Sequence, residues 1–174
     1  EFSLKKHHGR LNGWMSYTYS RTLIRSNSEF ESEQVNNGEF FPASYDKPHN
    51  LNIFANLKAS RRIVLSSTLN YSTGRPITYP VAKYQLGEQV LLHYSKFNQY
   101  RIPDYFRMDF SVTFEGSLKS NKKIDSSLTF SVYNVTARKN AYSVFFRSEG
   151  EKFEGYKLSV FATAIPTLSY NFKF

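Results

Sequence analysis

The sequence predicts an all-β protein, an antiparallel up-and-down meander of strands, from two regularities along the chain. Apolar and polar residues alternate strictly, most cleanly over residues 107–115 and 167–174, and this period of two gives a strand one apolar and one polar face. Short and long connections also alternate, as they do when all the short turns lie at one end of a sheet. No window has the period of an amphipathic helix.

The amino-acid composition excludes several classes of protein. The chain has 174 residues, no Cys, 17% aromatic residues and a net charge of +9 from 23 basic and 14 acidic residues. The length suits one domain or part of a larger one, and the absence of Cys excludes disulfide frameworks, thiolate zinc sites and Cys nucleophiles. No apolar run exceeds three residues, which excludes a transmembrane helix. The aromatic content argues against disorder.

The same alternation predicts four further strands, over residues 11–20, 50–59, 63–71 and 127–132. Three residues depart from the pattern, because Trp14 and Phe54 fall among the polar set and Ser67 falls in an apolar face. Pro166 lies inside the last strand region. Since proline cannot donate to a β-ladder, it predicts a bulge or a kink there.

The connections distinguish the two ends of the predicted sheet. Short turns are expected near residues 6–10, 59–62 and 117–124, and long polar connections near residues 26–47, 73–103 and 137–156. Transmembrane β-barrels have this asymmetry, and their strands need about 9–11 residues to cross a bilayer. The short turns hold eight basic residues: Lys5, Lys6, Arg10, Arg61, Arg62, Lys119, Lys122 and Lys123. Such a rim is either a solvated surface that prevents strand aggregation or a site that attracts anionic lipid headgroups.

Six or seven strands are too few to close a barrel in a membrane, since single-chain examples have at least about eight. An open sheet in hydrocarbon would leave about five N–H and five C=O groups unpaired on each edge, at several kcal/mol per group. The first residues already have the pattern of a strand. We therefore expect residues 1–174 to be a single partial domain, one piece of a larger barrel.

Six segments occur in a recognisable order: residues 9–22 (GRLNGWMSYTYSRT), 41–53 (FPASYDKPHNLNI), 71–80 (YSTGRPITYP), 100–112 (YRIPDYFRMDFSV), 130–146 (FSVYNVTARKNAYSVFF) and 165–174 (IPTLSYNFKF). Each alone is a weak signal. Together and in this order, they resemble the C-terminal part of TonB-dependent outer-membrane receptors of the group typical of Bacteroidota. The resemblance covers most of the chain outside the long loops.

The resemblance implies the last six or so strands of an outer-membrane barrel of about 22 strands that encloses a plug. It implies import of a nutrient too large for porins, such as a siderophore, glycan, peptide or vitamin. The implied partners are the rest of the barrel and its plug, TonB acting through that missing N-terminal part, lipid, lipopolysaccharide, a surface lipoprotein and the barrel assembly machinery. That machinery would read the end of the chain as its β-signal, through Leu168, Tyr170, Phe172 and Phe174.

Ligand contacts are expected from the loop of residues 73–103, where Tyr and Arg suit stacking on sugars or binding of acidic groups: Arg75, Tyr79, Tyr84, His93, Tyr94 and Tyr100. The alternative is that these aromatic residues pack the loop or form an interfacial girdle. Charged residues on the polar strand faces are expected to line the lumen: Lys58, Arg107, Asp109 and Glu115. Girdle or lipid-facing positions are expected for Tyr17, Tyr19, Tyr71, Phe110 and Phe172.

Motifs of catalysis are absent from the sequence, which contains no HExxH, no GxSxG and no phosphate-binding glycine loop. We therefore expect no enzyme activity, no cofactor and no metal, since the adjacent His7 and His8 point to opposite faces of a strand. Nucleic-acid binding is not expected either, because the basic residues lie in turns and the aromatic residues on apolar faces. Two other functions stay open: a non-transporting barrel that anchors a surface or secretion complex, and a soluble β-sheet binding module.

Overall fold

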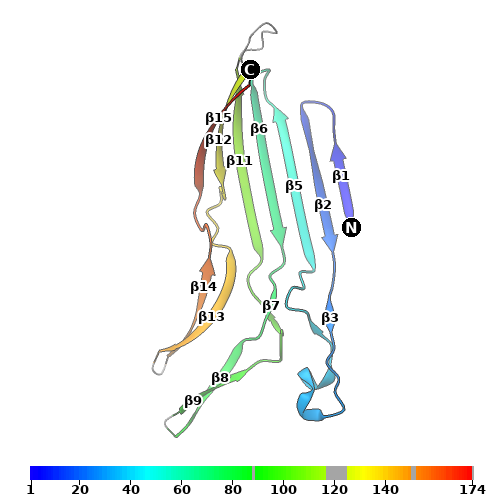
Figure 1. Cartoon of the computed structure of the whole chain (residues 1–174), viewed down its shortest axis with the longest axis vertical. Helices are drawn as coiled ribbons and strands as arrows, with labels where there is room; N and C mark the ends of the chain where they lie inside the picture. The colour runs from blue at the N-terminus through cyan, green and yellow to red at the C-terminus, as the bar shows by residue number, and fades with distance from the viewer. Residues whose placement is uncertain (88, 117–124, 150–151, 174) are drawn as a thin grey trace.

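The computed structural model describes residues 1–87, 89–116, 125–149 and 152–173, and β-strands dominate it (Figure 1). The helical elements of these ranges are two short 3-10 helices, η1 (Glu31–Glu33) and η2 (Val35–Gly38). Within the same ranges, no helix has the length and apolar character that crossing a membrane requires. The prediction of an all-β protein is confirmed for the described part of the chain.

Seven strands form one antiparallel sheet, and their spatial order follows their order in the chain (Figure 1). They are β1 (Phe2–Lys6), β2 (Leu11–Tyr19), β5 (His49–Lys58), β6 (Ile63–Ser72), β11 (Tyr105–Glu115), β12 (Asp125–Tyr133) and β15 (Ile165–Lys173). All except β1 have nine to eleven residues. The sheet is open, with β1 and β15 as its edges, and no barrel closes within the described residues.

The two ends of the sheet differ as the connection lengths predict. Residues 7–10 and 59–62 make short turns at one end, while the predicted turn at residues 117–124 lies outside the described residues. The long connections lie together at the other end (Figure 1). They contain four small two-stranded sheets: β3 (Leu23–Ile24) with β4 (Phe41–Pro42), β7 (Pro76–Ile77) with β10 (Tyr100–Arg101), β8 (Pro80–Leu86) with β9 (Gln89–Tyr94), and β13 (Ala141–Glu149) with β14 (Lys152–Ser159).

The sequence pattern predicted these connections as long and polar but did not predict the hairpins within them. The segments that form β8, β9, β13 and β14 carry β-branched and aromatic residues, such as Val144, Phe145 and Phe146 in β13, and these residue types favour strands. Their shorter and less regular alternation hid the hairpins from the sequence pattern.

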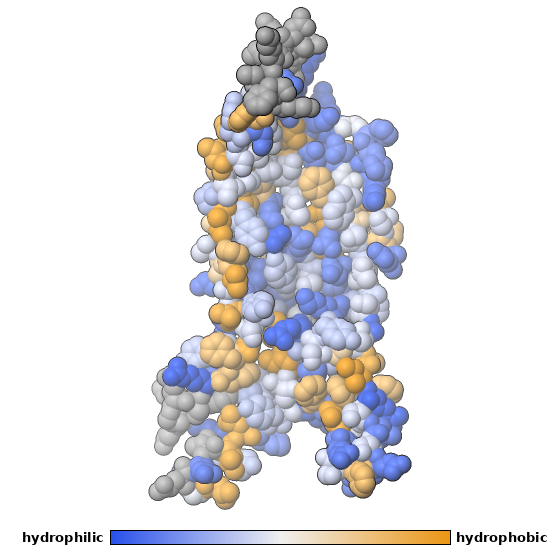
Figure 2. Space-filling view, in the orientation of Figure 1, coloured by the Kyte–Doolittle hydropathy of each residue, from blue (hydrophilic) through white to orange (hydrophobic). Residues whose placement is uncertain are grey.

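The pairing register separates side chains into one polar and one apolar face. A row of directly opposite residues crosses six strands on the polar face: Asn12, Asn56, Ser66, Ser111, Ser131 and Thr167. The neighbouring row on the other face is Leu11, Leu57, Leu65, Val112, Phe130 and Leu168. Figure 2 shows hydrophilic side chains over the central strands. Trp14 and Phe54 lie opposite each other on the polar face, and Ser67 lies on the apolar face.

Nothing in the described chain covers the apolar face. Leu168 is 68% exposed, Leu11 48% and Phe130 45%, although they belong to one continuous apolar row. Among the described residues, the buried hydrophobic side chains are Phe41, Ala43 and Ile102, which lie in or beside the long connections rather than under the sheet. Apolar patches of this extent mark a surface that contacts a partner or a membrane.

The bulge or kink predicted at Pro166 is absent. Strand β15 pairs with β12 in an unbroken register from Ile165 to Lys173, with Pro166 opposite Val132. Pro166 is the second residue of an edge strand of this sheet, and proline is tolerated there when its missing N–H points away from the neighbouring strand.

The register predicts which cysteine pairs can form disulfides. Ser66 and Ser111 are directly opposite, which places their Cα atoms about 4.5–5.5 Å apart, within disulfide range. Because the chain has no Cys, the double variant Ser66→Cys with Ser111→Cys should cross-link on mild oxidation, as measured by peptide mapping without reductant. The control, Ser66→Cys with Val112→Cys, places the thiols on opposite faces and should stay reduced. Cross-linking of the control pair alone would refute the register.

Candidate functional site

The long connections meet the sheet at a network of buried and half-buried polar side chains, here called the polar junction: Asp46, Arg101, Asp104, Asn134 and Asn140. Asp46 is its most buried charged group, with a side chain only 1% exposed. Its Oδ1 accepts the Thr22 N–H at 2.7 Å, and its Oδ2 forms an ion pair with the Arg101 guanidinium. Arg101 Nη1 also donates to the carbonyl oxygens of Asp46 at 2.8 Å and Gly74 at 2.9 Å. One guanidinium therefore joins two of the long connections.

Burial opposes ionisation of Asp46, but the Thr22 N–H, Arg101 and Arg21 together hold the pKa of its carboxyl below the ordinary value of 3.8. Arg21 Nε lies 3.5 Å from Oδ2. The Asp46 N–H donates to the Ala43 carbonyl at 2.8 Å and closes a turn just before Pro48. Asp46 is thus an ionised, fully partnered carboxylate, which is the condition for burying a charge without a large penalty.

Asp104 fixes the connection between β6 and β11. Its Oδ2 accepts the Tyr71 hydroxyl at 2.7 Å, and its Oδ1 accepts the Gly74 N–H at 2.9 Å. These two hydrogen bonds, the hydroxyl first, hold the pKa of Asp104 below its ordinary value against the effect of burial. A Cβ at position 74 would lie 1.7 Å from the Ile102 carbonyl oxygen, so only glycine fits there.

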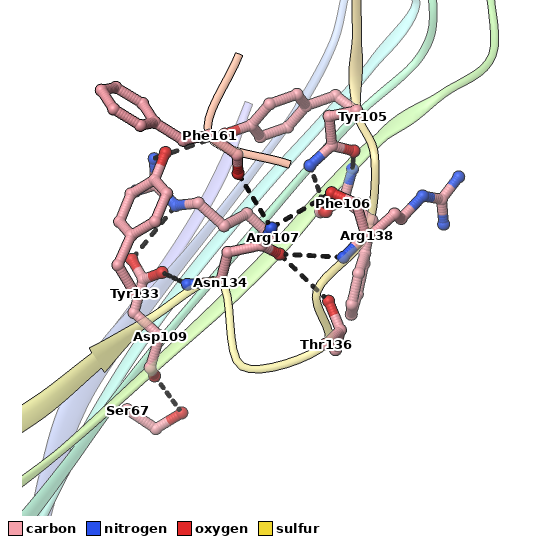
Figure 3. Close-up of polar contacts among 11 residues, drawn as sticks. Ser67, Tyr105, Phe106, Arg107, Asp109, Tyr133, Asn134, Thr136, Arg138 and Phe161 are labelled. Carbon is pink, nitrogen blue, oxygen red and sulfur yellow. Dashed lines mark hydrogen bonds and ion pairs between the residues drawn. The ribbon is translucent and has the colours of Figure 1, made fainter. Parts of the chain in front are cut away.

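Asn134 organises the end of β12 (Figure 3). The residue is 1% exposed, and its backbone has a positive φ of 53°, which asparagine tolerates better than most residues. Its N–H donates to Asp109 Oδ1 at 2.9 Å, and its side-chain Nδ2 donates to the carbonyls of Arg138 at 3.1 Å and Phe161 at 3.2 Å. Asn134 therefore connects β11, the turn after β12 and the return to β15.

Asn140 replaces a missing strand partner beside β11. Its Oδ1 accepts the Phe106 N–H at 3.0 Å and its Nδ2 donates to the Phe106 carbonyl at 2.8 Å. A side-chain amide thus satisfies both backbone groups of Phe106, beyond the point where the pairing of β11 with β12 ends at Phe110.

The charged residues predicted to line a lumen all lie on the polar face, but the structure brings only two of them together. Arg107 Nε lies 3.1 Å from Asp109 Oδ2. The Arg107 guanidinium also lies 4.6 Å from the centre of the Tyr133 ring and donates to the Tyr133 hydroxyl at 3.1 Å (Figure 3). Lys58 and Glu115 lie at the other end of the sheet, next to the short turns.

A cleft of about 460 Å³ opens beside the polar junction. Its walls combine two cationic side chains, four aromatic rings and an amide: Lys47, Arg75, Tyr105, Tyr133, Tyr142, Phe161 and Asn140. A second hollow of about 280 Å³ continues from it along the polar face and shares Lys47, Ser72 and Tyr105 with it. No acidic residue lines the cleft among the described residues. Such a surface suits hydroxyl-rich, aromatic or acidic ligand groups.

The six residues predicted to contact ligand are not gathered in one place. Arg75 lines the cleft, whereas Tyr79 packs with Tyr100, their ring centres 5.5 Å apart, and with Phe146 at 5.0 Å. The other three, Tyr84, His93 and Tyr94, lie exposed on the β8–β9 hairpin. Of the residues expected to form an assembly signal, Leu168, Tyr170 and Phe172 are exposed on the apolar face of β15, and Phe174 lies outside the described residues.

The sequence pattern missed the polar junction itself, although a signal was available. Asp46, Arg101, Asp104 and Asn134 all lie inside the six segments quoted above, beside prolines or just past the end of an alternating strand. Polar residues at such positions have no role in the strand pattern. Their presence in three different segments indicates a shared contact.

Comparison with known proteins does not assign a family or a function to the cleft or the polar junction. No protein-family model, curated protein or solved structure matches the chain. Within the described residues, no cluster of three or more His, Asp or Glu side chains could hold a metal ion. The candidate site is therefore defined by its own geometry, as a cationic and aromatic cleft supported by the polar junction.

Replacing Asp46 with Asn should destabilise the loop end of the sheet by about 3 kcal/mol, because it leaves Arg101 without its buried counter-charge. The expected readout is faster protease cleavage between residues 20 and 48. Glu39→Gln is the matched control, since the Glu39–Lys96 ion pair, 2.6 Å long, is exposed and exposed pairs contribute little. Equal cleavage of the two variants would contradict a structural role for Asp46.

The Asp104 contacts should weaken in acid. A carboxyl with a lowered pKa in the folded state contributes stability that is complete above its ordinary value of 3.8 and is lost as the pH falls through the folded-state pKa. Hydrogen exchange at the Gly74 amide, corrected for its intrinsic rate, should therefore accelerate in this acidic range. In Asp104→Asn this acceleration should be much weaker. An unchanged acid response in that variant would exclude Asp104 as its source.

Proposed function

We propose that this chain forms part of the wall and mouth of a TonB-dependent transporter barrel in the bacterial outer membrane, which imports a large nutrient. The polar face would line the lumen and the apolar face would contact lipid. The observation that carries the proposal is the apolar face, continuous over the sheet and uncovered within the described chain. In water such a surface would drive aggregation, whereas in a bilayer it is the favourable arrangement.

The dimensions of the sheet support a membrane location. The ten residues of β6 extend over roughly 33 Å at about 3.3 Å per residue, or about 23 Å of membrane thickness at a tilt of about 45°. The apolar band of outer-membrane barrels is about 25 Å tall. Tyr17, Tyr19 and Tyr71 lie on the apolar face at the long-loop end, and Tyr170 and Phe172 on the same face near the short-turn end, as aromatic girdles do.

The two free edges support a larger barrel. Strands β1 and β15 each pair on one side only within the described residues. Unpaired N–H and C=O groups in hydrocarbon cost several kcal/mol each, so strands from elsewhere would have to pair with both edges. The proposal of a barrel of about 22 strands supplies such partners.

The contacts between the six family-like segments support the TonB-dependent family. Residues from one segment, Arg101, Asp104 and Asp109, contact residues from three others, namely Asp46, Gly74 and Asn134. Residues that carry the resemblance are thus residues that hold the long connections on the sheet. Such contacts would be needed in every barrel with this loop architecture, whatever its ligand.

In the proposed mechanism, these connections capture ligand outside the cell, and the cationic and aromatic cleft contributes contacts at the mouth of the lumen. Lys47 and Arg75 would attract acidic groups, and Tyr105, Tyr133 and Tyr142 would stack on ring faces. Energy would come from TonB acting on a plug outside residues 1–174. The polar face provides hydrogen-bonding surface for plug and ligand.

Single cysteines in the protein that carries this chain, reconstituted in phospholipid vesicles, test the proposal. Spin labels on the apolar row, at Leu65→Cys, Val112→Cys and Phe130→Cys, should collide mainly with oxygen dissolved in lipid. Labels on the polar row, at Ser66→Cys, Ser111→Cys and Ser131→Cys, should collide mainly with a water-soluble nickel chelate, because neighbouring residues face opposite sides. If the labels at all six positions collide mainly with the nickel chelate, this result would contradict the membrane proposal and favour a soluble binding module.

A further inference from the structure

A shallow groove of about 190 Å³ crosses the apolar face near the short-turn end of β1, β2 and β5. The apolar-face residues that line it are Leu4, Lys6, Leu11, Gly13, Met15, Ile53 and Ala55. Gly13 forms the floor, directly opposite Lys6 on β1 and Ala55 on β5. The groove exists because this row of the apolar face is small, with Ser67 next in line on β6.

Large apolar side chains form the walls of the groove. Leu11 lies on one side of the floor, and Leu4, Met15 and Ile53 lie on the other. The floor is fixed by the backbone, since a Cβ at position 13 would lie 2.1 Å from the Phe54 carbonyl oxygen. Further along the same row, beyond the groove, Phe110 lies opposite Ser67. The result is a shallow apolar groove with Lys6 at its edge.

Lys6 is a cation on an otherwise apolar surface. It shares its face of β1 with Phe2 and Leu4, which are more than half exposed. None of the ion pairs among the described residues involves Lys6, and the side chain is exposed. The neighbouring turns add the exposed Arg10, Arg61 and Arg62. A lysine near the end of a lipid-facing strand extends its ammonium group to the interface, where anionic headgroups lie.

We propose that this groove binds one anionic phospholipid of the membrane, with its phosphate on Lys6 and part of one acyl chain along Gly13 and Ala55. Charge complementarity at the open end selects the headgroup, and the apolar walls accept the chain. The proposal depends on the proposed function, because the apolar face must lie in lipid. In this proposal, one of the basic residues at the short-turn end binds a specific ligand, in addition to being solvated like the others.

Paired lysine variants separate this site from general charge attraction. The neighbouring residue Lys5 lies on the polar face, opposite Trp14, so Lys5→Gln removes the same charge from the same rim without touching the groove. Native mass spectrometry of the purified membrane protein with added phosphatidylglycerol should give about fivefold weaker binding for Lys6→Gln, since one lysine near a membrane surface contributes about 1 kcal/mol. Lys5→Gln should bind like the original protein, and neither variant should change binding of phosphatidylcholine.

A second variant tests the groove without changing charge. Ala55→Phe fills the groove and should weaken binding of both lipids, whereas Leu128→Phe, on the same face but in β12, should not. Equal weakening by Lys6→Gln and Lys5→Gln, with Ala55→Phe inert, would overturn the lipid site and leave the membrane location intact. A protein that stays in solution without detergent and retains no lipid would overturn the proposed function together with this site.

Discussion

The structure depends on one constraint, the strict register of seven antiparallel strands. A shift by one residue between any two neighbours would move a row such as Leu57, Leu65 and Val112 to the polar face and a row such as Asn56, Ser66 and Ser111 to the apolar face. Within the described residues, no apolar core lies under the sheet that could absorb such an error. Alternation within each strand and register between strands therefore have to agree over the whole sheet, and in the described residues they do.

Different interactions stabilise the end of the sheet where the long connections lie. The seven-stranded sheet ends there, so backbone groups outside the four small two-stranded sheets need other partners, and few hydrophobic side chains are buried. Asp46, Asp104, Asn134 and Asn140 supply these partners with side-chain oxygens and amides. Buried polar groups of this kind are stable only when all of them are paired. The long connections are therefore held by directional contacts, which fix their positions more narrowly than apolar packing would.

The sequence predicted the sheet well because each strand carries its own period-two pattern, and short turns leave few alternative pairings. It predicted the loop end poorly. Asp46 and Arg101 are 55 residues apart, and no local pattern pairs them. Tyr79 and Tyr84 look alike in the sequence, yet one packs against Phe146 and the other lies on an exposed hairpin. Strand patterns are local properties of the chain, whereas the cleft and the polar junction arise from contacts between distant segments.

The position of the polar junction has an evolutionary consequence. It fixes each long connection at the points where the chain leaves and rejoins the sheet. Hairpins such as β8–β9 extend beyond these points, away from the sheet (Figure 1). Changes of sequence or length in those outer hairpins leave the anchoring contacts and the strand register untouched. In the proposed barrel, this arrangement would let loop tips vary with the ligand, while the wall and the loop bases stay under separate selection for folding.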